Sequence, residues 1–278
     1  MAAKEKVIPP LYFSGASMMD YQWIVMKKEE KVGTIVLNRP EALNFLDPWM
    51  AKELQEGLRD LEKDEEIRVI VITGAGRAFC AGGDIKSMQQ KKSPHEWIAR
   101  LESIAAVIKD MLSLPKPILA SVNGHAVGAG CNLALASDLI IASDKAVFSE
   151  VFSRIGLIPD CGGIFLLPRR VGWTKAKELI FTGKMITAQE ALQMNLINRV
   201  VPAEALEEET RRWAEELSAG ATLAIGLAKR LLNLSFQSDL EAILQAELSH
   251  QTFLRYTNDY QEGIRAFLEK RKPVFEGR

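Results

Sequence analysis

Hydrophobic and polar residues follow one another in short blocks along the first half of the chain, and each block predicts a strand or a helix. Residues 23–26 and 34–37 are β-rich runs on either side of a charged stretch with Gly33, which indicates a hairpin. Apolar residues then recur at helical spacing over residues 50–61. The next block, residues 68–73, is almost entirely apolar and is typical of a strand buried on both faces.

The alternation of strands and helices continues to about residue 150. Residues 101–111 carry one apolar helix face, and Pro115 and Pro117 end that helix. Residues 118–122 and 139–142 are two further strand-like runs. This order favours an α/β fold with helix-covered sheets.

The last quarter of the chain has a different pattern. From about Ala203 it is rich in Glu, Ala and Leu, with helical periodicity and no strand signals. Its apolar faces could cover the core or a neighbouring subunit, and the pattern does not choose between them. We therefore expect an N-terminal extension over residues 1–18, a core over residues 19–202 and a helical C-terminal subdomain over residues 203–278, with a role in oligomerisation.

Composition narrows the classes of function. The 278 residues include 35 Lys and Arg against 36 Asp and Glu, so no overall field draws the protein to nucleic acid or to an anionic membrane. Cys80, Cys131 and Cys161 form no CxxC pair, and the three histidines are scattered, which argues against a disulfide framework and a metal site. With no signal peptide or spanning segment apparent, we expect a cytoplasmic protein.

Two glycine-rich loops are candidates for ligand binding. Residues 78–86 follow the buried strand and contain Gly82 and Gly83, at the strand end where α/β folds usually bind ligands. Residues 123–134 follow the next strand and open an Ala-rich helix, whose first N–H groups are free to bind an anion. Tight turns and close helix packing explain the same small residues, and His125 in the second loop is expected to be structural.

Neither loop matches the phosphate-binding or dinucleotide-binding glycine motifs. Taken together and in this order, however, the two loops resemble the signature of the crotonase family of enoyl-CoA hydratases and isomerases. The run at residues 151–172, with Gly-Leu-Ile-Pro-Asp-Cys-Gly-Gly, also resembles that family, and the resemblance extends from residues 38–44 to residues 267–273. It implies a spiral of ββα units, a homotrimer or a dimer of trimers, and an acyl-CoA substrate with no separate cofactor.

The resemblance also assigns roles to main-chain groups. It implies that the thioester oxygen of the substrate lies between the N–H groups of Gly83 and Ala129, one from each loop. The family usually has Ala and Gly at these positions, but main-chain donors need not change with the side chain. Loss of one such donor typically costs about 3–4 kcal/mol of transition-state stabilisation.

A second set of residues is expected to bind coenzyme A. By resemblance, the adenine and the ribose phosphate lie near Ala42, Ala81, Asp84, Ile85 and Lys86, with help from the C-terminal cation Lys270. A solvated helix end would explain the basic run at residues 270–272 equally well.

The hydratases of the family use two glutamates to position water, and these positions align with Asn132 and Phe152. An amide can orient water but cannot take its proton, and Phe152 would exclude water from that side of the pocket. Efficient hydration by the usual route is therefore not expected. Leu101 and Phe152 are expected to shape the acyl pocket.

Asp160 aligns with the catalytic aspartate of dienoyl-CoA isomerases and ring-1,2-epoxyphenylacetyl-CoA isomerases. One carboxylate suffices to move a proton between C2 and C4 of an enoyl thioester, and an apolar pocket should raise its pKa. The local sequence alone favours a helix N-cap at Asp160 instead, which would make it a weak base.

These observations predict an enoyl-CoA isomerase acting in fatty-acid or aromatic-acid metabolism. The alternatives are a ring-1,2-epoxyphenylacetyl-CoA isomerase and a slow hydratase that uses Asp160 with Asn132. A crotonase-like protein that binds RNA or a partner without turnover is a further alternative, although no basic and aromatic stripe supports RNA binding.

Overall fold

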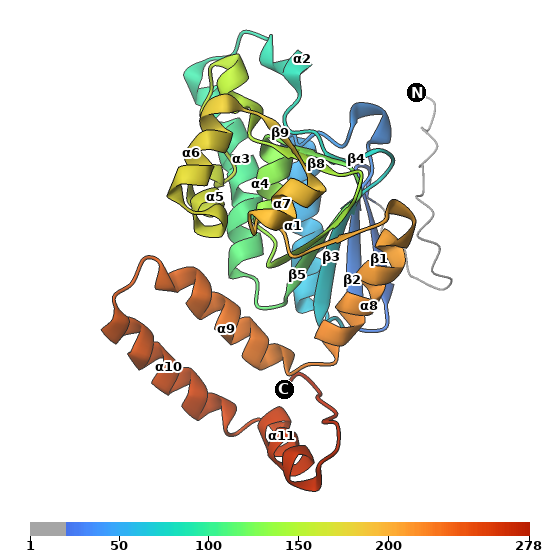
Figure 1. Ribbon diagram of the computed structural model, residues 1–278, viewed down its shortest axis with the longest axis vertical. Helices are drawn as coiled ribbons and strands as arrows, with labels where there is room; N and C mark the ends of the chain where they lie inside the picture. Colours follow the sequence, from blue (N-terminus) through green and yellow to red (C-terminus); the bar gives the residue numbers. More distant parts are fainter. Residues whose placement is uncertain (1–20) are drawn as a thin grey trace.

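The computed structural model describes residues 21–278, so the expected N-terminal extension lies outside the described residues (Figure 1). Its larger sheet has six strands in the order β1-β2-β3-β5-β7-β10. The strands are β1 (Ile24–Glu29), β2 (Val32–Leu37), β3 (Val69–Gly74), β5 (Ile118–Val122), β7 (Leu139–Ser143) and β10 (Arg199–Val201). Strands β1 and β2 form the predicted antiparallel hairpin, and the other neighbours run parallel. The sequence pattern did not predict β10.

A smaller sheet of four strands has the order β4-β6-β8-β9. Its strands are β4 (Ala78–Cys80), β6 (His125–Val127), β8 (Val147–Ser149) and β9 (Met185–Thr187). Each of the first three follows directly on a strand of the larger sheet, so the chain passes through both sheets in successive turns. This is the α/β spiral that the resemblance implied. Three residues are too few to show an alternating pattern, which is why these strands were not predicted.

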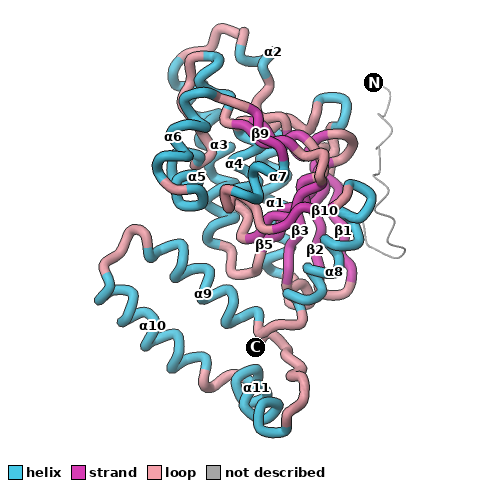
Figure 2. Tube along the Cα trace, viewed as in Figure 1, coloured by secondary structure: helices cyan, strands magenta, loops and turns pink. Residues whose placement is uncertain are grey.

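Eleven α-helices and three short 3-10 helices cover the sheets within the described residues. The α-helices are α1 (Pro48–Lys63), α2 (Ile85–Met88), α3 (Pro94–Ser113), α4 (Ala129–Leu135), α5 (Gly163–Val171), α6 (Trp173–Thr182), α7 (Ala188–Gln193), α8 (Leu206–Ser218), α9 (Thr222–Ser235), α10 (Leu240–Leu254) and α11 (Asn258–Glu269). The 3-10 helices are η1 (Pro40–Ala42), η2 (Val151–Ile155) and η3 (Ala203–Ala205). In Figure 2 the strands lie between α1, α3 and α4 on one side and α8 on the other.

The main core lies between the sheets and α1, α3 and α4. Helix α1 begins where the sequence dictates, because the Asp47 carboxylate accepts a hydrogen bond from the Met50 N–H and Pro48 occupies the first turn. Its apolar stripe, including Leu54 and Leu58, is fully buried. The predicted helices over residues 50–61 and 101–111 are both confirmed.

The C-terminal helices differ in whether they cover the core. Helix α8 packs Leu206 and Trp213 on the outer face of the larger sheet, so this part of the region covers the core. Helices α9 to α11 extend away from the sheets at the bottom of Figure 1, and α10 has no buried residue. Their exposed apolar side chains include Leu232, Phe236, Leu240, Leu248, Phe253, Phe267 and Leu268.

Three glycines allow the turns around β4 and β6 to come into backbone contact. A Cβ placed on Gly130 would lie 2.0 Å from the Cys80 carbonyl oxygen, and one on Gly124 would lie 2.1 Å from the Arg77 carbonyl oxygen. A Cβ on Gly82 would lie 2.7 Å from the Val127 carbonyl oxygen. The neighbouring atoms are main-chain atoms of a buried sheet, so they cannot move aside as a flexible side chain could. The start of α4 is therefore fixed against the end of β4.

We expect Gly130→Ala to lower the free energy of unfolding by about 1–3 kcal/mol or more, because overpacking would push α4 away from β4. Gly263→Ala is the matched control, since both glycines are helical but a Cβ on Gly263 would lie 3.5 Å from its nearest neighbour, the Phe275 ring. The control should be neutral or more stable by about 0.5–1 kcal/mol. Urea unfolding measures both, and equal stability of the two variants would contradict the close approach.

Candidate active site

The two glycine-rich loops meet at the end of β4 and at the start of α4. Gly82 has a φ of +92°, and a Cβ there would lie 3.6 Å from the Ala129 nitrogen. Gly128, which precedes α4, has φ 55° and ψ −125°, and no side chain caps the helix. Glycine adopts such angles readily, whereas other residues do so only under strain. The loops thus place the Gly83 and Ala129 segments side by side.

The N–H groups of Gly83 and Ala129 donate to no internal partner within the described residues. Within residues 21–278, neither group donates a hydrogen bond to another main-chain or side-chain atom. Ala129 is the first residue of α4, where N–H groups carry the positive end of the helix dipole. Both donors are therefore free to stabilise a negatively charged oxygen from outside the chain.

Phe152 forms an apolar wall beside these donors. It lies in η2 and is almost fully buried, and its ring is 3.6 Å from the position that a Cβ on Gly128 would occupy. The aromatic ring keeps water from this side of Gly128. Leu101, the other predicted pocket residue, lies on α3 and is half exposed.

Asp160 is not a helix cap. Helix α5 begins after Gly162, which occupies the capping position, and no side chain accepts a hydrogen bond from its first turn. Cys161 and Gly162 have φ values of 47° and 77°, and this left-handed turn separates Asp160 from the helix. The capping alternative from the sequence is therefore wrong, because the helix starts later than the local pattern suggests.

The Asp160 carboxyl group is partly desolvated. Its Oδ1 atom is buried and has no hydrogen-bond partner among the described residues. Burial raises the pKa of Asp160 above its usual value, and the neighbouring Cys161 thiol offsets part of this effect. A partly desolvated carboxylate of this kind is a stronger base than one in water.

Asn132 lies next to Asp160 and is fully buried. Its Nδ2 donates to the Asp160 carbonyl oxygen at 2.9 Å and, over a longer 3.4 Å, to Glu150 Oε2. A Cβ on Gly163 would lie 2.4 Å from Asn132 Nδ2, so α5 also packs directly on this amide. Asn132 thus anchors the turn that carries Asp160.

Glu150 is a titratable residue of this site that the sequence analysis did not single out. It follows β8, is 2% exposed, and its Oε1 has no partner within the described part of the chain. Burial raises the pKa of Glu150 to about 7, the Cys131 thiol and the Asn132 amide lower it, and the charge of Asp160 adds to the rise. A lone acidic residue among the apolar residues Val147, Phe148, Val151 and Phe152 was the available signal.

The predicted coenzyme A residues fall into two groups. Ala42 and Ala81 are neighbours, because the Ala81 N–H donates to the carbonyl oxygen of Leu43 at 3.0 Å. Asp84 caps the short helix α2 through a 3.0 Å hydrogen bond from the Lys86 N–H, and Ile85 and Lys86 are exposed.

Lys270 lies apart from that group. It caps α11 at the bottom of Figure 1, whereas α2 lies at the top. Within a single chain, Lys270 therefore does not lie beside the other predicted coenzyme A residues.

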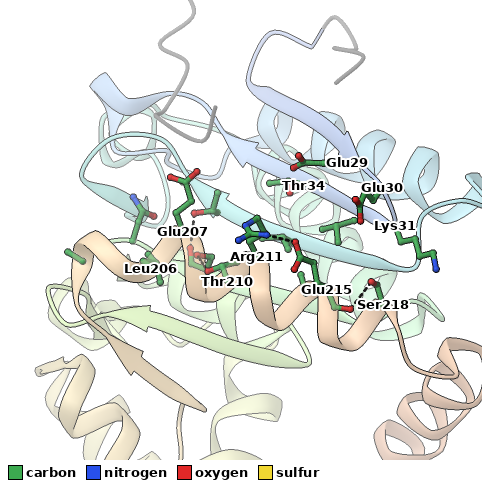
Figure 3. Close-up of a pocket in the computed structure, with 18 of the residues that line it drawn as sticks. Glu29, Glu30, Lys31, Thr34, Leu206, Glu207, Thr210, Arg211, Glu215 and Ser218 are labelled. Atoms are coloured by element: carbon green, nitrogen blue, oxygen red, sulfur yellow. Dashed lines mark hydrogen bonds and ion pairs between the residues drawn. The ribbon is translucent and has the colours of Figure 1, made fainter. Parts of the chain in front are cut away.

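Two cavities lie elsewhere in the fold, and the first reaches the second loop only at Asn123. One of about 520 Å³ separates α8 from the larger sheet, where Arg211 and Glu215 form a 2.6 Å ion pair (Figure 3). Another of about 460 Å³ lies under α9, beside Phe165 and Phe236. Neither is lined by Gly83, Ala129 or Asp160. Over residues 21–278 no group of side chains could hold a metal ion, and no helix is long and apolar enough to cross a membrane.

The chain is similar to known proteins over most of its length. Residues 27–278 match the family model for enoyl-CoA hydratase/isomerase. A probable mitochondrial enoyl-CoA hydratase of Dictyostelium discoideum is 38% identical over 254 residues, covering 91% of this chain and 90% of the relative. The 1,2-epoxyphenylacetyl-CoA isomerase of Escherichia coli (strain K12) is 37% identical over 260 residues, covering 92% of this chain and 99% of the relative.

The fold agrees as well. A crystal structure of enoyl-CoA hydratase from Bacillus anthracis matches with a TM-score of 0.87 at 36% identity, covering 92% of this chain and 100% of that one. The spiral of two sheets and the helical C-terminal region are thus shared with solved structures. The chain belongs to the enoyl-CoA hydratase/isomerase family, the crotonase superfamily.

Proposed function

We propose that this protein is an enoyl-CoA isomerase that shifts a double bond of an acyl-CoA thioester. The N–H groups of Gly83 and Ala129 hold the thioester oxygen, and Asp160 is the base. The observation that carries this proposal is the Asp160 carboxyl group, which is partly buried, has a buried and unpartnered Oδ1 and does not cap its helix. Family membership supports the acyl-CoA substrate.

The proposed reaction needs one carboxylate and no net change in protons. Asp160 removes a proton from C2 of a 3-enoyl thioester, and the electron pair moves onto the thioester oxygen as a dienolate. The two N–H groups stabilise this charge, and Asp160 returns the proton to C4. A preorganised pair of donors and a positioned base are the two largest contributions expected in such a step.

Hydration is the less favoured reaction at this site. Asn132 occupies a position where hydratases of the family carry a carboxylate, and its Nδ2 is already shared between the Asp160 carbonyl and Glu150. Phe152 fills the second position with an apolar ring. Neither residue can take a proton from water.

Isomerisation of a ring epoxide is the second candidate function. The similarity to a 1,2-epoxyphenylacetyl-CoA isomerase over nearly the whole chain favours it. The same oxyanion hole and carboxylate would serve such a thioester, and the identity of the acyl group separates the two candidates.

We also propose that the protein works as a homo-oligomer, a trimer or a dimer of trimers. Many apolar side chains of α9 to α11 face solvent in a single chain, and exposed patches of this kind usually mark protein interfaces. A second copy could also bring Lys270 to the coenzyme A group around Ala42, Ala81 and Asp84 to Lys86. The three cysteines are free and buried, which suits the reducing cytoplasm.

Purified protein should isomerise a 3-enoyl-CoA or a ring-epoxide thioester faster than it hydrates a 2-enoyl-CoA. Asp160→Asn should lower the isomerisation rate roughly 10²–10⁴-fold, because the amide cannot accept the proton. Substrate binding should persist, since the N–H donors are unchanged. Steady-state kinetics with the three thioesters measure both effects.

The matched control is Asp110→Asn, which removes a carboxylate outside the site, in a 3.4 Å ion pair with Arg59. This variant should keep its activity. Faster hydration than isomerisation, or full isomerase activity in Asp160→Asn, would refute the proposed reaction.

Gly128→Ala should reduce kcat by roughly 10²–10³-fold, the effect of losing one oxyanion donor. A side chain at φ 55° and ψ −125° is strained, and relief of the strain would turn the Ala129 N–H away from the substrate. Gly156→Ala is the control, because Gly156 also has a positive φ of 73° but no atom lies within 4 Å of its Cβ position. If both variants keep full activity, the Ala129 donor does not serve the reaction.

Light scattering after size-exclusion chromatography should give the mass of three or six chains. Leu248→Asp places a charge on the exposed face of α10 and should shift the mass toward the single chain. Ser249→Asp, on the same helix, tests whether any added charge has this effect. A monomer in the unaltered protein would contradict the proposed assembly.

A further inference from the structure

Glu150 is a buried carboxyl group that the proposed reaction does not use. Three elements surround it: β8 precedes it, α4 contributes Cys131 and Asn132, and the turn before α5 contributes Asp160 and Cys161. The described residues place no cation in hydrogen-bond contact with it. The Arg170 guanidinium on α5 instead donates to the carbonyl oxygens of Leu135 and Ser137.

Three oxygen atoms of this cluster lack partners. Asn132 Oδ1, Glu150 Oε1 and Asp160 Oδ1 are each buried, and none accepts a hydrogen bond within the described part of the chain. Buried polar atoms in native proteins nearly always have a partner. The three oxygens are therefore free to accept a hydrogen bond, and the residues that carry them are linked through the Asn132 amide.

We propose that Glu150 is a positioning residue of the isomerase. It orients Asn132 against the Asp160 turn, and its charge sets the basicity of the Asp160 carboxylate. This inference rests on the proposed function of Asp160. Glu150 itself has no path to the substrate, because it is 2% exposed and Asn132 is packed against it.

The charge of Glu150 acts on Asp160 through like-charge repulsion. While Glu150 is neutral, Asp160 ionises alone. The charge of Asp160 contributes to the raised pKa of Glu150. Because repulsion between like charges is mutual, loss of the Glu150 proton makes the Asp160 carboxylate a stronger base. The two carboxyl groups titrate as a coupled pair, and the upper step falls near the Glu150 pKa of about 7.

Glu150→Gln tests this role, because the amide keeps the shape and an acceptor for Asn132 but cannot ionise. In the unaltered protein, kcat/KM for a 3-enoyl-CoA should rise in two steps with pH, the second near pH 7. The variant should lack the second step, so that its kcat at pH 8 is roughly three- to tenfold lower with KM unchanged. Glu215→Gln on α8, which removes a surface ion pair with Arg211, should keep both steps.

A second readout does not depend on activity. Burial raises the folded-state pKa of Glu150 from 4.5 to about 7, so between these pH values the folded protein binds a proton that the unfolded chain has lost. The bound proton stabilises the folded protein below pH 4.5, and this stabilisation is lost as the pH rises to 7. The melting temperature should therefore fall more between pH 5 and pH 8 in the unaltered protein than in Glu150→Gln.

The two readouts separate failure of this inference from failure of the proposed function. If no isomerase activity is found but the melting temperatures diverge as expected, Glu150 titrates as inferred and the reaction assigned to Asp160 is wrong. If the protein is an isomerase and Glu150→Gln keeps the step near pH 7, the role of Glu150 is refuted. Equal loss of melting temperature in both proteins also refutes it.

Discussion

Backbone contact between the turn after β4 and the turn that opens α4 is the constraint on which the rest of the site depends. Gly82, Gly124 and Gly130 leave no space for a Cβ against the facing carbonyl groups. This contact sets the Gly83 and Ala129 segments next to each other, although they come from separate turns of the spiral. The smaller sheet holds the contact in place through the pairing of β4 with β6.

The carboxyl groups depend on the same framework. Helix α4 carries Asn132, whose amide binds the Asp160 carbonyl and reaches Glu150. The start of α4 is fixed by the glycine contact, so the position of the Asp160 turn relative to the two N–H groups is fixed through one short helix. Packing, hydrogen bonding and desolvation thus all act on the cluster of Asn132, Glu150 and Asp160.

Much of the fold could be predicted from the sequence, because long apolar runs and helical stripes are strong signals. The hairpin, β3, β5, β7, α1 and α3 lie where their patterns place them. Strands of three residues are too short to show an alternating pattern. The packing of α8 on the sheet and the extension of α9 away from it depend on contacts with residues far away in the sequence. For the site, motif resemblance led to Asp160 and the two loops. The left-handed turn that frees Asp160 from α5, and the burial of Glu150, arise from tertiary contacts that local sequence does not encode.

A crystal structure with a bound, unreactive enoyl-CoA analogue tests the central claim most directly. We predict that the thioester oxygen lies about 3 Å from both the Gly83 and the Ala129 nitrogens, with the Asp160 carboxylate facing C2 and C4 of the acyl chain. A thioester oxygen that contacts neither nitrogen, or an Asp160 side chain turned away from the acyl chain, would contradict it.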